Sequence, residues 1–530
     1  MTSNAQESAP AEWQSLLDAL AAETLAAEQL GGEAAVERLH ERNKLTARER
    51  LALLFDDATF HEIGRFALGV IDVPGRPSRN VPADAIVTGW GRVDGRIVLA
   101  LADDGTIASG ARGQIGGRKA AYIRALAQRT RHPLVQLLEA SAGRMQNMMG
   151  SQFAGAAGAS GGVSDSGLSW KSGVVPTVSA AMGFSFGGPS FQAPATDFII
   201  MVKDTGFLGV GGPPVVRGGL GIDVSPADIG GIAMHAKKTG FADHVADGDA
   251  ECIKIIRSFL SYLPSSCLSY PPDAPCDDPI DRPTPELIDI VPFNHRHAYD
   301  VKKVIKQVVD DGEYLEMKPD YGRNIVTCFA RLGGHAVGII ANQPKVNGGI
   351  NDVRAGAKTN RFVQICNAYH VPLVFLQDQP GFLVGPKAEA EDTARTIARY
   401  QNTIYGVDLP IVTIILRKAY GYSYWLLGGK PVGADVVAAW PSAAISLAGP
   451  EVGVNTLLER ETKQGEVSAT RRDALYDEYR EDSRAVKAAR GFRIDDVIEP
   501  AETRAYLCNN LRMILAKRDV NPTWANSIDA

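Results

Sequence analysis

Residues 92–98, Arg-Val-Asp-Gly-Arg-Ile-Val, have a counterpart 239 residues later in residues 331–337, Arg-Leu-Gly-Gly-His-Ala-Val. Three proline positions keep the same order at nearly the same offset: Pro133 with Pro372, Pro176 with Pro410, and Pro213 with Pro450. Four matches in one order at a nearly constant offset indicate that one domain has been duplicated. The alternative is that the two halves are unrelated α/β domains whose strands both begin with a common X-Pro-hydrophobic pattern.

Short strand-like segments alternate with helical ones in both halves, which predicts α/β layers. In the first half we expect strands at 85–90, 96–102, 134–138 and 174–182, and helices within 11–50, 119–131 and 226–238. In the second half we expect strands at 325–330, 336–340 and 373–376, and helices at 301–309 and 355–369. Thr46 followed by Glu49 has the spacing of a capping box, so a helix is expected to begin there.

A proline-rich segment separates the two halves. Seven prolines and a cluster of aspartates lie between Pro264 and Glu286, a composition that is typical of an extended linker. We therefore expect an N-terminal domain over 1–265, a linker over 266–295 and a C-terminal domain over 296–530.

The composition excludes several classes of protein. The 530 residues are too many for one compact core, and 55 Lys and Arg against 61 Asp and Glu argue against a general nucleic-acid binder. The six cysteines form no C-x-x-C pair, which disfavours a zinc ribbon. The uncharged stretch between Lys171 and Asp197 is interrupted by three prolines, so it does not predict a membrane helix. We expect a cytoplasmic protein without nucleic-acid, membrane or metal binding.

One motif suggests a hydrolase. Residues 183–187, Gly-Phe-Ser-Phe-Gly, fit G-x-S-x-G after a predicted strand, which would make Ser185 a nucleophile. The repeat offset of 234 places Ala419 opposite Ser185, but Gly421 opposite Gly187. Both halves therefore keep the glycine turn and not the serine, which disfavours the hydrolase.

The paired glycine turns suit a different chemistry. Backbone N–H groups exposed in such a turn can stabilise a developing oxyanion. Gly187 and Gly188 in the first half, and residues 421–423 (Gly-Tyr-Ser) in the second, would form two such anion holes. Two holes suit the transfer of a group between two carbonyl-containing reactants. Ordinary tight turns without a binding role are the alternative.

Further stretches resemble one known family, the carboxyltransferase (beta) subunits of biotin-dependent acyl-CoA carboxylases such as propionyl-CoA and acetyl-CoA carboxylases. The resemblance covers the chain from about residue 33. Its landmarks are residues 44–50, 196–204, 228–231 with His235, 378–382, 415–421 and 433–441. It implies two tandem crotonase-like domains, with acyl-CoA bound on the N-terminal side and biotin on the C-terminal side. It also implies a homohexamer with sites between the N-terminal domain of one subunit and the C-terminal domain of its partner.

The resemblance also implies the reaction. Carboxybiotin, carried by a biotin carboxylase/biotin carboxyl carrier (alpha) subunit, would deliver a carboxyl group to the α-carbon of a coenzyme A thioester. The residues implied as catalytic are Gly187, Gly188, Tyr422 and Ser423. Those implied in substrate binding are Gly143, Arg144, Gln146, Gly421 and Trp425. Those implied in biotin binding are Pro380, Gly381, Phe382 and Tyr424.

This sequence departs from the family pattern around both holes. Residues 421–425 are Gly-Tyr-Ser-Tyr-Trp where the family has G-G-A-Y-D, and Pro189 removes one N–H donor beside the first hole. We therefore expect a remodelled pocket and a non-standard acyl-CoA. A decarboxylase or transcarboxylase subunit, and a non-catalytic scaffold whose biotin hole is blocked by Tyr422, are the alternatives. Met-Lys-Pro at 317–319 is only weakly similar to a biotinylation sequence, so we expect Lys318 to be an ordinary surface lysine.

Overall fold

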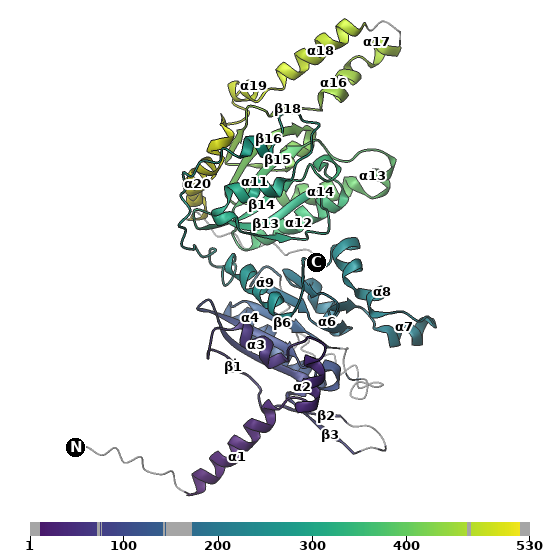
Figure 1. Ribbon diagram of the computed structural model, residues 1–530, viewed down its shortest axis with the longest axis vertical. Helices are drawn as coiled ribbons and strands as arrows, with labels where there is room; N and C mark the ends of the chain where they lie inside the picture. Colours follow the sequence, from purple (N-terminus) through teal and green to yellow (C-terminus); the bar gives the residue numbers. More distant parts are fainter. Residues whose placement is uncertain are drawn as a thin grey trace, which may run out of the picture. The chain divides into compact units, whose positions relative to one another are not determined.

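The computed structural model describes residues 11–71, 75, 77–140, 144, 172–463 and 468–519. These residues form two compact units. Unit 1 comprises 1–171, 177–234 and 245–257, and unit 2 comprises 172–176, 235–244 and 258–530. Each unit is built around one mixed sheet with helices packed on it (Figure 1).

The sheet of unit 1 has the strand order β1-β4-β5-β6-β7-β9-β11. Its strands are β1 (His61–Glu62), β4 (Ile86–Val93), β5 (Arg96–Asp103), β6 (Leu134–Leu138), β7 (Thr177–Ala181), β9 (Phe198–Val202) and β11 (His244–Ala246). Two small pairs, β2 (Leu68–Ile71) with β3 (Arg79–Pro82) and β8 (Phe184–Phe186) with β10 (Phe207–Gly209), lie outside it. The helices of the first half are α1 (Ala11–Glu28), α2 (Glu33–His40), α3 (Ala47–Leu54), α4 (Gln114–Thr130), α6 (Gly188–Gln192), α7 (Pro213–Leu220), α8 (Pro226–Gly230) and α9 (Asp249–Ser261).

The sheet of unit 2 has the order β12-β13-β14-β15-β16-β17-β19, with β18 (Ala444–Ser446) paired to β16. Its strands are β12 (Tyr314–Met317), β13 (Ile325–Leu332), β14 (His335–Asn342), β15 (Leu373–Gln379), β16 (Ile411–Tyr420), β17 (Val436–Ala439) and β19 (Asp496–Val497). The helices are α10 (Leu287–Ile290), α11 (Val301–Val308), α12 (Val353–Ala368), α13 (Pro386–Ala390), α14 (Thr393–Tyr405), α15 (Gly421–Leu426), α16 (Pro450–Leu457), α17 (Glu459–Lys463), α18 (Ala469–Asp482), α19 (Ala485–Arg490) and α20 (Thr503–Ile514).

The two sheets confirm the predicted pair of similar α/β domains. Their strand orders match position by position, and in each a hairpin leads into a run of parallel strands. The hairpins close at Val93 with Arg96 and at Leu332 with His335. These two closing pairs are 239 residues apart, which is the offset found in the sequence.

A buried lysine is duplicated together with the fold. The ammonium of Lys119 donates to the carbonyl of Ile86 at 2.6 Å, and that of Lys358 donates to the carbonyl of Ile325 at 2.8 Å. Each lysine also donates to one further carbonyl. Each therefore links a helix to the first residue of the long hairpin strand. A buried ammonium must be hydrogen-bonded in this way to offset its lost hydration.

The two repeats cap the same helix differently. In unit 2 Asp352 is the N-cap of α12 and accepts a hydrogen bond from the Ala355 N–H at 2.8 Å. The equivalent position in unit 1 is Gly113, which has no side chain to do this. The carboxylate of Asp84, from another segment, accepts from the Gly116 N–H at 2.7 Å instead. Both helices thus have a carboxylate that accepts from the equivalent N–H, but it comes from the N-cap residue in unit 2 and from a distant residue in unit 1.

The landmark at 44–50 closes a buried ion network in unit 1. The predicted capping box of Thr46 and Glu49 is present at the start of α3. The guanidinium of Arg50 binds Glu139 at 2.6 Å and Asp249 at 2.8 Å, and Lys44 also pairs with Glu139. Two cations thus neutralise two carboxylates, which buried charges require.

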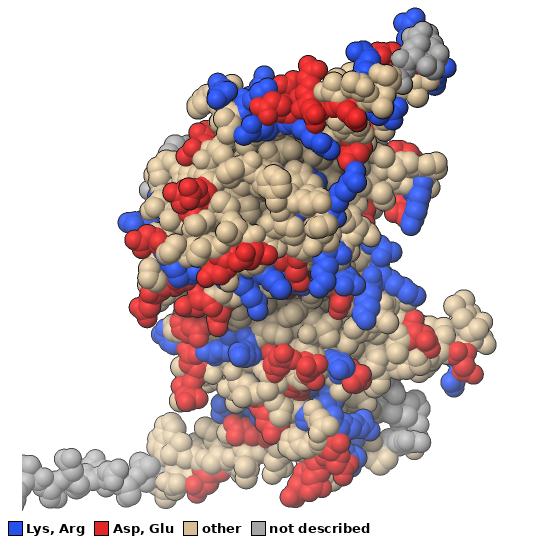
Figure 2. Space-filling view, turned by 45° about the horizontal axis from the view of Figure 1, so that its top comes forward, with Lys and Arg blue, Asp and Glu red and all other residues tan. Residues whose placement is uncertain are grey.

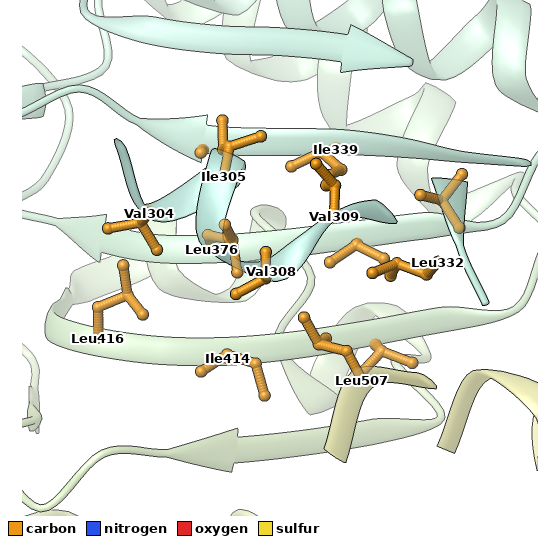
Figure 3. Packing of buried hydrophobic residues seen from close by; sticks show 14 of the residues in the cluster. Val304, Ile305, Val308, Val309, Leu332, Ile339, Leu376, Ile414, Leu416 and Leu507 are labelled. Carbon is orange, nitrogen blue, oxygen red and sulfur yellow. The ribbon is translucent and has the colours of Figure 1, made fainter. Parts of the chain in front are cut away.

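The core of unit 2 is an aliphatic layer between helices and sheet. Val301, Val304, Ile305 and Val308 form the buried face of α11, at the spacing expected of an amphipathic helix. Figure 3 shows side chains of α11 and α20 gathered against those of the sheet. This layer covers one face of the strands whose ends carry the predicted biotin side.

The proline-rich segment lies within unit 2. The Ala274 N–H donates to the Gly334 carbonyl at 3.0 Å and the Thr284 N–H to the Ala501 carbonyl at 2.8 Å. The boundaries at 265 and 295 stay predictions.

The expectation for Lys318 was wrong. Its ammonium is buried and pairs with Asp243 at 2.9 Å, a partner 75 residues away that no local pattern indicates.

Three further properties bear on possible partners. Acidic and basic side chains are intermingled on the face shown in Figure 2. No helix in the described ranges is both long and apolar enough to cross a bilayer. The same residues contain no cluster of three or more His, Cys, Asp or Glu side chains able to hold a metal ion.

Lys358 predicts a pH dependence of stability. Burial lowers the pKa of Lys358 to about 7 from an ordinary value of 10.5. Between these values the unfolded chain binds more protons, so the free energy of unfolding contributed by Lys358 rises with pH. In urea unfolding at pH 7, 8 and 9, the free energy of unfolding of the wild type should therefore rise relative to that of Lys358→Met. The expected rise is up to about 1.4 kcal/mol per pH unit.

The exposed Lys345 provides the control. The difference between wild type and Lys345→Met should stay flat over this range, because an exposed ammonium keeps its water in the folded state. A flat difference for Lys358→Met as well would contradict the prediction.

Candidate functional site

The two predicted glycine turns have the same construction. In unit 1 strand β8 pairs in parallel with β10, and in unit 2 the end of β16 pairs in parallel with β18. Gly187 with φ 70° follows β8, and Gly421 with φ 66° follows β16. A left-handed backbone of this kind favours glycine, which lacks a Cβ. Each turn leads directly into a short helix, α6 or α15, and neither helix has a side-chain cap among the described residues.

The first turn offers fewer free donors than expected. The Gly187 N–H donates to the Gly209 carbonyl at 3.1 Å, so it already has a partner in the backbone. Pro189 has no N–H to offer. The N–H of Gly188, the first residue of α6, has no intrahelical acceptor, and a side chain at this position would meet nothing within 4 Å. In unit 1 the structure thus leaves Gly188 as the donor of the predicted pair.

The second turn presents the first N–H groups of α15, from Gly421, Tyr422 and Ser423. The Ser423 hydroxyl is buried and donates to the Tyr420 carbonyl at 2.8 Å, so it braces the turn. The Tyr422 hydroxyl donates to Gln401 on α14 at 2.7 Å. Trp425 packs edge-on against Tyr422 with ring centroids 5.7 Å apart, and its side chain is 45% exposed.

The residues expected to bind biotin lie at the same edge of unit 2. Gln379 of β15 is paired with Ala419 of β16, so Pro380 and Tyr420 follow at the ends of neighbouring parallel strands. The Gly381 carbonyl accepts hydrogen bonds from the Asn351 N–H at 3.0 Å and from the Gln379 amide at 3.1 Å. These bonds fix the loop of Pro380, Gly381 and Phe382 to the end of β15 and to the segment before α12.

Tyr424 is buried beneath this edge. Burial, with a smaller contribution from Asp495, raises the pKa of Tyr424 to about 12. Its hydroxyl is therefore neutral near pH 7 and is not poised to act as a base.

A buried ion pair that was not among the predicted site residues holds this edge together. The guanidinium of Arg417 binds the carboxylate of Asp378 at 2.9 Å, and both side chains are fully buried. Arg417 also donates to the carbonyls of Pro292, Asn294 and His297 at 3.1, 3.0 and 2.9 Å. Both charged residues lie in stretches that carry the family resemblance, 378–382 and 415–421, and this was the sequence signal that could have identified them.

The expected acyl-CoA segment is described only in part. Gly143 and Gln146 lie outside the described residues. The buried guanidinium of Arg144 pairs with Asp84 and donates to the Ala111 carbonyl at 2.9 Å. The guanidinium of Arg144 is therefore held by buried groups of its own chain.

Ser185 lacks the setting of a nucleophile. It lies inside strand β8 and is fully buried, and its hydroxyl is 3.3 Å from the Gly183 carbonyl, to which it donates. A catalytic serine requires exposure on a turn and an adjacent base. The hydrolase reading is wrong for this geometry.

Removal of the charge on Asp378 should destabilise unit 2. In Asp378→Asn the buried Arg417 loses its counter-charge, and a buried pair broken in this way costs about 3–5 kcal/mol. Urea unfolding measures the loss. Asp320→Asn, which changes an exposed carboxylate, should stay within about 0.5 kcal/mol of wild type. An equal effect of the two substitutions would count against the ion pair.

Comparison with known proteins agrees with this geometry. The carboxyl transferase domain family matches residues 38–527. The chain is 37% identical to the methylmalonyl-CoA decarboxylase subunit alpha of Propionigenium modestum, over 93% of this chain and 94% of that protein. It is also 37% identical to the carboxyltransferase subunit of the Haloferax mediterranei propionyl-CoA carboxylase, with the same coverage.

A solved structure matches nearly the whole chain. It is the transcarboxylase 12S subunit, described as a hexamer with methylmalonyl-CoA and methylmalonic acid bound, and it superposes with a TM-score of 0.87 at 34% identity. The match covers 99% of this chain and 100% of that one. The chain therefore belongs to the carboxyl transferase family, and it is a biotin-dependent acyl-CoA carboxyltransferase with two crotonase-like domains.

Proposed function

We propose that this chain moves a carboxyl group from carboxylated biotin on a partner chain to the α-carbon of a non-standard acyl-CoA. One observation carries the proposal: the two repeats place equivalent glycine turns, Gly187 with φ 70° and Gly421 with φ 66°, at the starts of helices without a side-chain cap. Such helix starts offer N–H groups and a favourable dipole to an oxygen that gains negative charge.

The two turns take different reactants. In unit 1 the N–H of Gly188 would stabilise the thioester oxygen as the α-proton leaves, and Gly187 provides the turn. The proton would pass to biotin once biotin has given up its carboxyl group. In unit 2 the N–H groups of Tyr422 and Ser423 would hold the ring carbonyl oxygen of biotin. Carboxylated biotin supplies the carboxyl group when it is bound. No side-chain nucleophile is needed, which agrees with the buried position of Ser185.

The remaining predicted residues position these reactants. Pro380, Gly381, Phe382 and Tyr424 border the biotin ring at the edge of unit 2, beside Gly421. The uncapped start of α15 and the fixed loop at Gly381 fit a planar ring with a carbonyl acceptor. The buried pair with Asp84 fixes the position of Arg144, the described residue of the expected acyl-CoA segment.

The assembly follows from the relatives. We propose a biotin carboxylase/biotin carboxyl carrier subunit as the partner chain, and a homohexamer as the oligomer. The transcarboxylase 12S structure is described as a hexamer, and its 34% identity over 99% of this chain supports the same assembly here.

The reaction is tested with the purified chain and its biotin-carrying partner. ATP, bicarbonate and a panel of acyl-CoA thioesters are added, and carboxylated products are measured by mass spectrometry. We expect ATP-dependent carboxylation of at least one thioester, blocked by avidin, which sequesters biotin. No carboxylated product from any thioester would reject the proposal.

The reverse reaction is a second candidate. The chain is as similar to a methylmalonyl-CoA decarboxylase subunit as to a propionyl-CoA carboxylase subunit, at 37% identity each. Release of CO₂ from malonyl-type thioesters with free biotin, without ATP, would favour this direction. Carboxylation with ATP and bicarbonate that exceeds it would favour the forward one.

Trp425 should limit the acyl group. Its exposed indole packs on Tyr422 next to the anion site. Removal of its bulk in Trp425→Ala should raise kcat/KM for long or branched acyl-CoA relative to acetyl-CoA by about tenfold. Phe492→Ala removes another exposed aromatic ring of unit 2 and should leave this ratio unchanged. A constant ratio in Trp425→Ala would exclude a role in acyl selection.

A further inference from the structure

We propose that Gln377, Tyr400 and Thr413 are positioning residues of the biotin-side anion site, because they hold helix α15 by its C-terminal end. This inference rests on the proposed function of the N-terminal end of α15. None of the three was among the predicted site residues, and none contacts the N–H groups that would bind the oxygen.

The three side chains together bind four successive or nearly successive carbonyls. The Gln377 amide donates to the Tyr424 carbonyl at 3.2 Å and also to that of Leu427. The Tyr400 hydroxyl donates to the Leu426 carbonyl at 2.9 Å. The Thr413 hydroxyl donates to the Gly428 carbonyl at 2.6 Å. The last carbonyls of a helix have no intrahelical partner, and here buried side chains supply the donors.

The donors come from three separate elements. Gln377 lies on β15, Tyr400 on α14 and Thr413 on β16, and each is at most 1% exposed. Burial also raises the pKa of Tyr400, so its hydroxyl keeps the proton that it donates. Buried hydrogen bonds of this kind are costly to break, because the carbonyl left behind cannot reach water.

A glycine makes one of these bonds possible. Gly428 has φ 80°, and a Cβ there would lie 2.3 Å from Phe375 and 2.6 Å from the Thr413 hydroxyl. The chain can therefore approach Thr413 closely only with glycine at this position. Close approach and hydrogen bond together fix where α15 ends.

The length of α15 explains why this anchor matters for the reaction. The helix has six residues, so it is about 9 Å long and too short to hold its own orientation. Its free end carries the N–H groups of Tyr422 and Ser423. Any tilt at the anchored end moves these donors as a unit, and misplacement by about 1 Å can lower a rate about 100-fold.

The test compares variants in the complex of full chain and partner subunit, with free biotin as a second probe of the site. Tyr400→Phe and Thr413→Val each remove one hydroxyl and keep the shape of the side chain. We expect each to lower kcat about tenfold and to raise KM for free biotin, with KM for the acyl-CoA within about twofold. Thr413→Ser restores the hydroxyl and should recover most of kcat.

Tyr369→Phe is the matched control for a purely structural effect. Tyr369 is also fully buried in unit 2, and its hydroxyl donates to the Val175 carbonyl at 2.7 Å, away from α15. Its loss should lower the melting temperature as much as Tyr400→Phe does, without the change in kcat. An equal loss of kcat in both variants, or in neither, would overturn the inference.

Two substitutions at Tyr422 separate this inference from the proposed function. Tyr422→Pro removes one backbone N–H in the first helical turn, where proline is tolerated, and Tyr422→Ala keeps that N–H. A loss of kcat in Tyr422→Pro beyond that in Tyr422→Ala, together with unaffected Thr413→Val and Tyr400→Phe, would reject the anchor alone. Unaffected kcat in Tyr422→Pro would reject the anion site, and the anchor with it.

Discussion

The buried pair of Arg417 and Asp378 fixes the edge of unit 2 on which the biotin side depends. It joins the ends of two neighbouring parallel strands, β15 and β16, with both charges fully withdrawn from water. Such a pair is stable only when further groups satisfy it, and three backbone carbonyls do so for Arg417. The loop at 380–382 and the turn at 421–423 each begin within four residues of one member of this pair.

Duplication gave both units one topology, and each unit then changed its details. The buried lysines of α4 and α12 bind the same strand positions in both. The caps of those helices differ, since Asp352 acts locally and Asp84 acts from a distance. The glycine turns differ as well, because the Gly187 N–H is used within the backbone while the first N–H groups of α15 are presented by a helix held at its other end. A common scaffold can thus serve two different reactants.

Helix α15 shows how polarity can be divided along one short element. Its C-terminal carbonyls are fully engaged by buried donors, whereas its first N–H groups receive no side-chain cap from the described residues. The carbonyls at the C-terminal end are therefore hydrogen-bonded, which holds the helix in place. The N–H groups at the N-terminal end remain available to a reactant. Tyr422 and Trp425, which depart from the family pattern, place two aromatic rings around the N-terminal end of α15. The backbone N–H groups of that end are still present.

The sequence by itself determined the repeat, the alternation of strands and helices, the capping box at Thr46 and the positions of both glycine turns. These features depend on short-range patterns or on comparison of the two halves. Tertiary structure decided which partner each polar group binds. The Gly187 N–H donates to the Gly209 carbonyl, Arg144 pairs with Asp84 across 60 residues, and the buried Lys318 pairs with Asp243. Partners so distant in the chain leave no periodic signal, because the fold alone brings them into contact.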